Sequence, residues 1–182
     1  MRILKRFVFI LFAGGLCAGI AFKILWVQVD PNKASTVISA IHQRGANWIL
    51  TDSWKDPKSW EQILKNIETG LPEWIEVYSL LAPETKGKGE KEIIAAVSKA
   101  LLKNPDLVLK TIASESSPFG IEKICGRLSD DELEFLDEGV DALKAQMASV
   151  NRVAEPELLS AKEKCLGQIR YVLAREIFRE DE

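Results

Sequence analysis

The sequence predicts an all-α fold: an N-terminal signal or anchor helix, then a small multi-helix bundle that ends in a long antiparallel helical hairpin. Apolar residues recur at spacings of three and four in nearly every segment, which is the period of one helix face. Asp56-Pro57 and Asn104-Pro105 each place a capping side chain directly before a proline at the first helical position. No strand pattern competes with these signals, because the apolar triplet at residues 48–50 is too short to count.

Residues 1–29 have the character of a secretory signal peptide or a signal anchor. Basic residues at the start of the chain precede an apolar stretch over residues 7–22, and no acidic residue occurs before Asp30. Because the positive charge lies on the N-terminal side, we expect the N-terminus to stay in the cytoplasm and the remaining chain to cross the membrane. The mature part would then face the periplasm, either anchored in the inner membrane or soluble.

Three fates of this segment can be distinguished. Lipidation of Cys17 is disfavoured, because Leu16 stands where a lipoprotein signal needs a small residue. Cleavage after Ala21 is the second outcome. Retention as an anchor through residues 7–29 is the third and the one we favour, since Lys23 near the outer end can extend its ammonium toward the headgroups. Cleavage and retention both remain open.

Gly15 and Gly19 lie four positions apart within this segment. Small residues at this spacing let two membrane helices approach closely. The pair is consistent with a weak homodimer through the anchor, although glycines are also common near the end of a signal for processing reasons.

Composition limits the classes of partner. The chain has 182 residues, 24 of them basic and 27 acidic, and 47% are hydrophobic, which is enough for one packed domain after the signal. Without the four basic residues that precede Asp30, 20 basic residues remain against 27 acidic ones, a net charge of −7. No basic stripe is left, so nucleic-acid binding is not expected.

The exported part divides by pattern into a linker at residues 30–34, a subdomain of short helices at residues 35–128 and a helical hairpin at residues 129–182, packed together as one domain. In the subdomain, Ser35 or Thr36 is expected to cap the first helix, and the charged loop at residues 83–89 is expected to be exposed. Six helices are predicted there, over residues 35–45, 57–70, 72–81, 90–103, 105–112 and 121–125.

The hairpin is the clearest part of the pattern. Ser129 and Glu132 form a capping box at its start, and Pro156 begins its second helix after a five-residue turn. Helices joined by so short a link pack antiparallel. The inward positions of the first helix are Leu133, Leu136, Val140, Leu143, Met147 and Val150. Those of the second are Leu158, Leu159, Cys165, Leu166, Ile169, Val172, Leu173 and Phe178.

Cys125 and Cys165 are expected to form a disulfide. They are an even pair in a chain predicted to reach an oxidising compartment, and the alternative is two buried apolar thiols. On the chain-entropy model, closing a loop of about 40 residues contributes roughly 3–4 kcal/mol. Cys125 precedes the hairpin, whereas Cys165 lies within its second helix. The bridge therefore requires the segment before Ser129 to fold back along the hairpin.

Few residues point to catalysis or to metal binding. His42 is the only histidine, so two-histidine zinc sites are excluded, and its place at the edge of an apolar helix face indicates a boundary packing role. The acidic run at residues 129–141 lies at a helix N-terminus, where carboxylates are favoured by the helix dipole, and it lacks the ligand spacing of a calcium loop. No metal site and no cofactor are expected.

The fragment IASESSPFG, residues 112–120, resembles the segment around the catalytic acid of lytic transglycosylases, where a glutamate is followed by serine near a helix end. The resemblance implies that Glu115 would donate a proton to a glycosidic oxygen. It covers about nine residues. The Gly-Leu-Met-Gln and Tyr-Asn motifs of that family are absent, which puts the carry-over in doubt.

Four tryptophans lie within about thirty residues. Trp60 and Trp74 fall on the inward faces of their helices and are expected in the core. Trp48 and Trp54 lie in sequence that we interpret as irregular, and they are candidates for an interaction surface.

LLKNPDLVLKTI at residues 101–112, ICGRL around Cys125 and AKEKCLGQIR around Cys165 resemble a loose group of small exported all-helical proteins of proteobacteria. The resemblance covers about half of the chain and its motifs are not very specific. It implies export and an all-helical fold, and it carries no activity onto any residue.

Two functions from different classes follow. The leading hypothesis is a non-enzymatic exported protein that acts through contact with a protein partner in the cell envelope, as accessory and immunity-type proteins do. The alternative is a cell-wall-acting glycosidase-like enzyme or a sugar-binding module that uses Glu115 and the exposed tryptophans.

Overall fold

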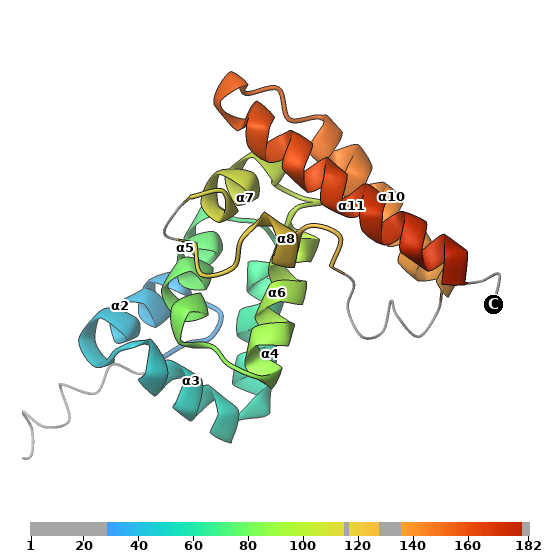
Figure 1. Cartoon of the computed structure of the whole chain (residues 1–182). Helices are drawn as coiled ribbons and strands as arrows, with labels where there is room; N and C mark the ends of the chain where they lie inside the picture. The colour runs from blue at the N-terminus through green and yellow to red at the C-terminus, as the bar shows by residue number, and fades with distance from the viewer. Residues whose placement is uncertain (1–28, 115–116, 128–135, 180–182) are drawn as a thin grey trace, which may run out of the picture. The chain divides into compact units, whose positions relative to one another are not determined.

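Every regular element in the described part of the chain is a helix. The computed structural model describes residues 29–114, 117–127 and 136–179, without the side chains of residues 52–55, 136–138 and 176–179. Within these ranges no strand occurs, and the all-α prediction is confirmed for them (Figure 1).

The described helices follow one another from residue 34 to residue 179. The α-helices are α2 Ala34–Arg44, α3 Ala46–Lys55, α4 Pro57–Ile67, α5 Pro72–Leu81, α6 Lys88–Ala100, α7 Pro105–Ile112, α8 Ile121–Ile124, α10 Leu136–Asn151 and α11 Leu159–Arg179. Two 3₁₀ turns, η1 Ala82–Glu84 and η2 Pro156–Leu158, precede α6 and α11.

The predicted Asx-Pro helix starts are confirmed. Asp56 caps α4, where its carboxylate accepts hydrogen bonds from the Lys58 amide at 3.3 Å and from the Ser59 hydroxyl at 2.6 Å. Asn104 caps α7 in the same way, accepting from the Leu107 amide at 3.4 Å. These caps are local in sequence, which is why the pattern alone located both helices.

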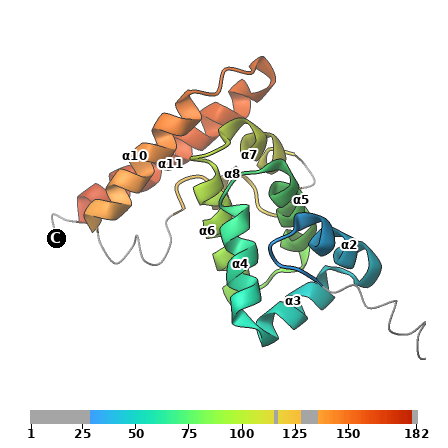
Figure 2. The same ribbon diagram turned by 180° about the vertical axis from the view of Figure 1, so that it is seen from behind.

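Helix α5 lies at the centre of the N-terminal helices. It packs against α2, α3, α4, α6 and α7, and five of its ten residues are buried. The two views show α4 and α6 running side by side next to it (Figures 1 and 2). Its buried side chains are Trp74, Ile75, Val77, Tyr78 and Leu81.

Helices α7 and α8 connect these helices with the last two. Each of them packs against both α6 and α11, and α7 also contacts α10. Helices α10 and α11 lie side by side in both views (Figures 1 and 2). The inward faces predicted for them are confirmed at Leu143, Val150, Leu166 and Ile169, each at most 1% exposed.

Four expectations about the elements were wrong. Residues 46–55 form helix α3 and are not irregular, and its buried Ala46, Ile49 and Leu50 follow the spacing of a helix face. The N-cap of α2 is Lys33, while Thr36 donates to the Lys33 carbonyl oxygen.

In the last helix, Pro156 begins the 3₁₀ turn η2 rather than α11, and Leu159 is 49% exposed although it was expected to face inward. The extra turn rotates Leu159 away from the core and leaves Leu158 buried. The loop at residues 83–89 is exposed at five of its seven residues, in line with the expectation, while Thr85 is buried and donates to the Ala82 carbonyl oxygen.

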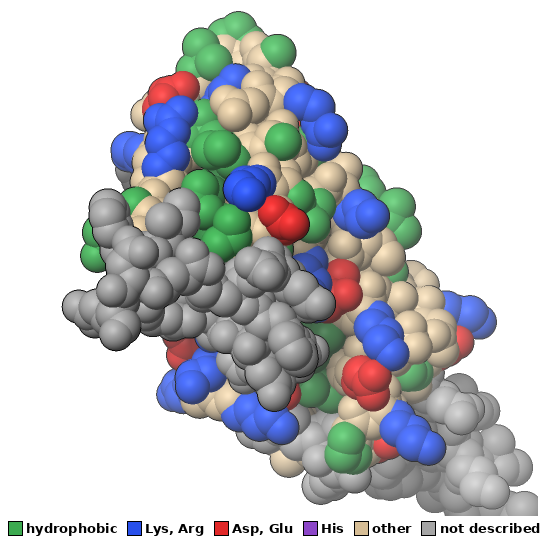
Figure 3. All heavy atoms as spheres, turned by 90° about the vertical axis from the view of Figure 1, so that its right-hand side faces the viewer, with side chains coloured by type: hydrophobic (Ala, Val, Ile, Leu, Met, Phe, Trp, Pro, Cys, Tyr) green, Lys and Arg blue, Asp and Glu red, His purple; other side chains and the backbone are tan. Residues whose placement is uncertain are grey.

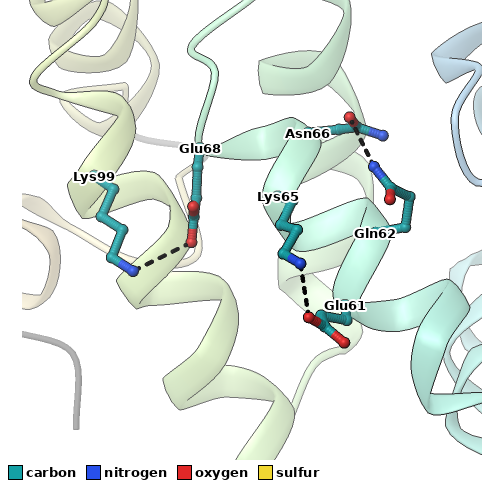
Figure 4. Close-up of polar contacts among 6 residues, drawn as sticks. All are labelled: Glu61, Gln62, Lys65, Asn66, Glu68 and Lys99. Atoms are coloured by element: carbon teal, nitrogen blue, oxygen red, sulfur yellow. Dashed lines mark hydrogen bonds and ion pairs between the residues drawn. The ribbon is translucent and has the colours of Figure 1, made fainter. Parts of the chain in front are cut away.

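The described surface carries charges of both signs. On the face in Figure 3, separate Lys and Arg side chains alternate with Asp and Glu side chains and with small apolar areas. Glu61 and Lys65 form an exposed pair along α4 at 2.8 Å, and Lys99 of α6 reaches Glu68 after α4 at 3.4 Å (Figure 4). The hydrogen bond from Lys65 lowers the pKa of Glu61, and the same bond raises the pKa of Lys65. Pairs this exposed contribute little to stability.

Candidate functional site

A disulfide joins the end of α8 to α11. The sulfur atoms of Cys125 and Cys165 lie 2.05 Å apart and their Cα atoms 5.3 Å apart, and both side chains are at most 1% exposed. The predicted disulfide is confirmed. The bridge requires the segment before Ser129 to fold back along the last two helices. Helix α8 meets this requirement, because it packs directly against α11.

Gly126 lets the chain approach α11 at this point. Its φ is +74°, a backbone conformation that L side chains rarely adopt. A Cβ atom there would lie 3.0 Å from Val172 Cγ2 and 3.4 Å from the carbonyl oxygen of Gln168. The backbone next to Cys125 therefore lies directly on α11, which brings the two cysteines together.

A buried polar network supports the same turn. Gln146 of α10 accepts a hydrogen bond from the Gly126 amide at 3.2 Å and donates to the Arg127 carbonyl oxygen at 3.1 Å. It also donates to the Ser98 hydroxyl of α6 at 3.1 Å, and that hydroxyl donates to the Ile124 and Arg127 carbonyl oxygens at 2.9 Å. Sequence reasoning missed this network, because polar residues 48 positions apart give no periodic signal.

A second polar contact joins α10 to α6. The Ser149 hydroxyl of α10 donates to the Leu101 carbonyl oxygen at 2.8 Å, at the C-terminal end of α6. Ser149 is 2% exposed. Because the last carbonyl groups of a helix lack partners within the helix, this hydroxyl satisfies a group that burial would otherwise leave unpaired.

A cleft of about 390 Å³ opens beside the disulfide, between α6, α8 and α11. Cys125, Gly126 and Val172 form part of its wall. Its charged lining residues are Glu90, Lys91, Glu122, Lys123, Arg127 and Arg175. Lys123 pairs with Glu90 at 2.9 Å and lies 5.2 Å from the centre of the Phe119 ring.

Two residues of this cleft have unusual environments. The Nε atom of Arg127 is buried and has no hydrogen-bond partner among the described residues. Tyr171, which also lines the cleft, is 64% exposed. Arginine and tyrosine are both enriched at protein interfaces.

A second cavity, of about 580 Å³, lies between α4 and the start of α6. Trp60 is part of its wall, with its indole N–H donating to Glu92 at 2.7 Å, and Glu92 also pairs with Lys88 at 3.4 Å. Trp60 is only 6% exposed, and Trp74 is 5% exposed. Both tryptophans belong to the core, as the sequence predicted.

Most predicted site residues lie away from the cleft. Trp48 is half-buried on α3, and the Arg44 guanidinium lies 4.3 Å from the centre of its ring. The side chain of Trp54 and all of Glu115 lie outside the described residues. His42 is exposed near the end of α2, so the expected boundary packing role was wrong.

Tyr78 is a buried titratable group that the sequence did not single out. Its hydroxyl makes no hydrogen bond within the described ranges, and burial raises the pKa of Tyr78 to about 12. Ser117 lies close enough to oppose that rise in part, while its own hydroxyl donates to the Phe119 carbonyl oxygen at 2.8 Å.

Nowhere in the described part of the chain do three or more His, Cys, Asp or Glu side chains gather as ligands of one metal ion. Across the same ranges, no helix combines the length and the apolar character that a membrane span requires.

The resemblance to small exported helical proteins stays a prediction. No protein-family model, no curated protein and no solved structure matches this chain.

Proposed function

We propose that this protein is exported and acts without catalysis, through contact with a protein partner on the periplasmic side of the inner membrane. In this proposal residues 7–29 anchor the chain, or the segment is removed after Ala21. The body that begins after the linker then presents a contact surface to the partner.

The disulfide is the observation that supports this proposal most strongly. Cys125 and Cys165 are paired and buried, and disulfides of this kind form and persist in oxidising compartments such as the periplasm. A cytosolic chain of the same sequence would be kept reduced and would lose the link between α8 and α11.

We also propose that α10 and α11 form the antiparallel hairpin expected over residues 129–182. The connection between them spans only residues 152–155 before η2 begins. The Lys162 ammonium donates to the carbonyl oxygens of Asn151 and Val153, both at 2.8 Å, which places a cation at the C-terminal end of α10. A hairpin fixed in this way and joined to α8 gives a rigid support for a contact surface.

The cleft beside the disulfide is the region that we assign to the contact. Rigid elements reduce the entropy lost on binding, and the cleft wall includes Cys125 of the disulfide. Among the described residues that line the cleft, Tyr171 is the one exposed large hydrophobic side chain, at 64%.

In-cell photocrosslinking tests the proposal. The full chain would carry the photoreactive residue p-benzoylphenylalanine in place of Tyr171, with a second variant at Trp48 and a control at Lys110, an exposed residue of α7 that does not line the cleft. We expect a discrete adduct with another protein from position 171 and none from position 110. The absence of a protein adduct from both 171 and 48 would overturn the proposal.

The glycosidase-like alternative stays a prediction, because Glu115 lies outside the described residues. Its test is the Glu115→Gln variant in cells. An unchanged phenotype would remove the enzymatic version.

A further inference from the structure

We propose that the cleft between α6, α8 and α11 receives an acidic peptide segment of the protein partner. Lys91 and Arg127 contact its carboxylates, and the Tyr171 ring packs against its backbone and side-chain stems. This inference rests on the proposed function, since it specifies the chemistry of the same contact.

The first argument is charge. Apart from Arg175, the lining has three cationic side chains and two carboxylates, whereas the whole chain has a net charge of −3. Glu90 and Lys123 neutralise each other at 2.9 Å. Lys91 is exposed, and no ion pair engages it among the described residues. An excess of positive charge in a concave site on an acidic protein favours anionic ligands and disfavours basic ones.

The second argument is the environment of Arg127. Its carbonyl oxygen is held by Ser98 and Gln146, so the backbone from which its side chain extends is fixed by the buried network. Its guanidinium is half-buried, its Nε is unpaired, and no carboxylate pairs with it in the described part of the chain. A guanidinium that is partly desolvated without a compensating anion gains more from a carboxylate than a fully solvated one does.

The third argument is size and shape. A volume of about 390 Å³ accommodates a few side chains of an extended segment, and Tyr171 supplies an exposed aromatic face at its edge. Tyrosine and arginine together are characteristic of the residues that dominate binding energy at interfaces. The cleft therefore fits a short acidic stretch better than a whole partner helix.

Fluorescence anisotropy with defined peptides tests the inference. The oxidised full chain in a mild detergent would be titrated into fluorescein-labelled hexaglutamate, with hexaglutamine and hexalysine as comparison peptides. We expect hexaglutamate to bind more tightly than either, and its affinity to fall as salt is raised.

Single substitutions then locate the site. Lys91→Gln and Arg127→Gln are each expected to weaken hexaglutamate binding about three- to tenfold, while the matched control Lys110→Gln leaves it unchanged. Lys91→Gln and Tyr171→Ala alter exposed side chains, so they carry the test if Arg127→Gln fails to fold. Equal affinity for hexaglutamate and hexaglutamine, or equal loss in Lys91→Gln and Lys110→Gln, would overturn the inference.

Different results would overturn the proposed contact function and the acidic-segment inference. Two proteins are compared, both with the photoreactive residue at position 171 and only one of them with Lys91→Glu. If both form the adduct in cells with the same yield, the acidic-segment inference is wrong and the contact function stands. If hexaglutamate binds but no adduct forms from position 171 or 48, the proposed contact function is wrong.

Discussion

Gln146 of α10 donates a hydrogen bond to the hydroxyl of Ser98 in α6 over 3.1 Å, although 48 residues separate them in sequence. Both side chains are almost fully buried, at 3% and 1% exposure. The same amide group holds the turn at Gly126 and Arg127. One side chain therefore connects α10, α6 and the turn after α8, whose Gly126 and Arg127 line the cleft.

Gln146→Leu should destabilise the protein strongly. Leucine has a similar volume, so the change removes the hydrogen bonds without leaving a large cavity, and it leaves the buried Gly126 amide without its acceptor. We expect a loss of about 2 kcal/mol or more in the free energy of unfolding, measured by urea denaturation. The control is Gln43→Leu, whose exposed amide donates to the Ser39 hydroxyl of its own helix. A loss no larger in Gln146→Leu than in this control would show that the network does not stabilise the fold.

Removing the disulfide should lower the free energy of unfolding more than removing Cys17 does. The Cys125→Ala, Cys165→Ala double variant releases a constraint between residues 40 positions apart, and we expect it to lose about 3–4 kcal/mol in the free energy of unfolding. Reduction of the unmodified chain should produce a similar loss, while Cys17→Ala should produce none. Equal stability of the oxidised and reduced chains would contradict this prediction.

Gly126 and Gly87 form a matched pair for testing the close approach to α11. Both have positive φ, +74° and +60°, so alanine is strained at either position. Only at Gly126 does the added Cβ meet other atoms, with Val172 Cγ2 at 3.0 Å, while nothing lies within 4 Å at Gly87. We expect Gly87→Ala to lower the free energy of unfolding by about 1 kcal/mol. Gly126→Ala should lower it by at least about 1 kcal/mol more. Equal losses in thermal or urea unfolding would mean that the α11 side chains move aside freely.

The buried Tyr78 should make the stability of the protein fall at alkaline pH. Its pKa rises from about 10 in the unfolded chain to about 12 in the fold. A group with a raised pKa contributes its full stabilising effect below the unfolded value and loses it as the pH climbs through the folded value. The unmodified protein should therefore lose stability between about pH 10 and pH 12 through this group.

Tyr78→Phe should remove that part of the alkaline loss and should leave stability near neutral pH unchanged or slightly higher, because the buried hydroxyl has no partner among the described residues. Urea unfolding of both proteins across this pH range checks the prediction. An identical pH dependence in the two proteins would contradict it.

Local signals made much of the fold predictable from sequence. Helices α4 and α7 begin at capped prolines, and the inward face of α11 follows from its apolar spacing. Helix α3 is harder to predict, because Trp48, Ile49 and Leu50 form only a short apolar triplet. The signal for this helix is the spacing of Ala46, Ile49 and Leu50.

The candidate site was largely beyond sequence reasoning, with the exception of its disulfide. Two cysteines, in a chain expected from its sequence to be exported, were enough to predict that Cys125 and Cys165 pair. The cleft, in contrast, takes Lys91 from α6, Arg127 from the turn after α8 and Tyr171 from α11. Lys91 and Tyr171 are 80 residues apart in sequence. Which side chains meet over such a separation depends on tertiary packing, and no periodicity of the sequence predicts it.

Thiol trapping in intact cells tests most directly the claim that the protein is an exported helical body held together by a disulfide. The Cys17→Ala variant would be treated with a mass-adding alkylating reagent before and after reduction, and its mobility compared by gel electrophoresis. The account predicts no modification before reduction and two modified cysteines after it. Modification of Cys125 and Cys165 without reduction would contradict both the disulfide in the cell and the export on which the proposed function rests.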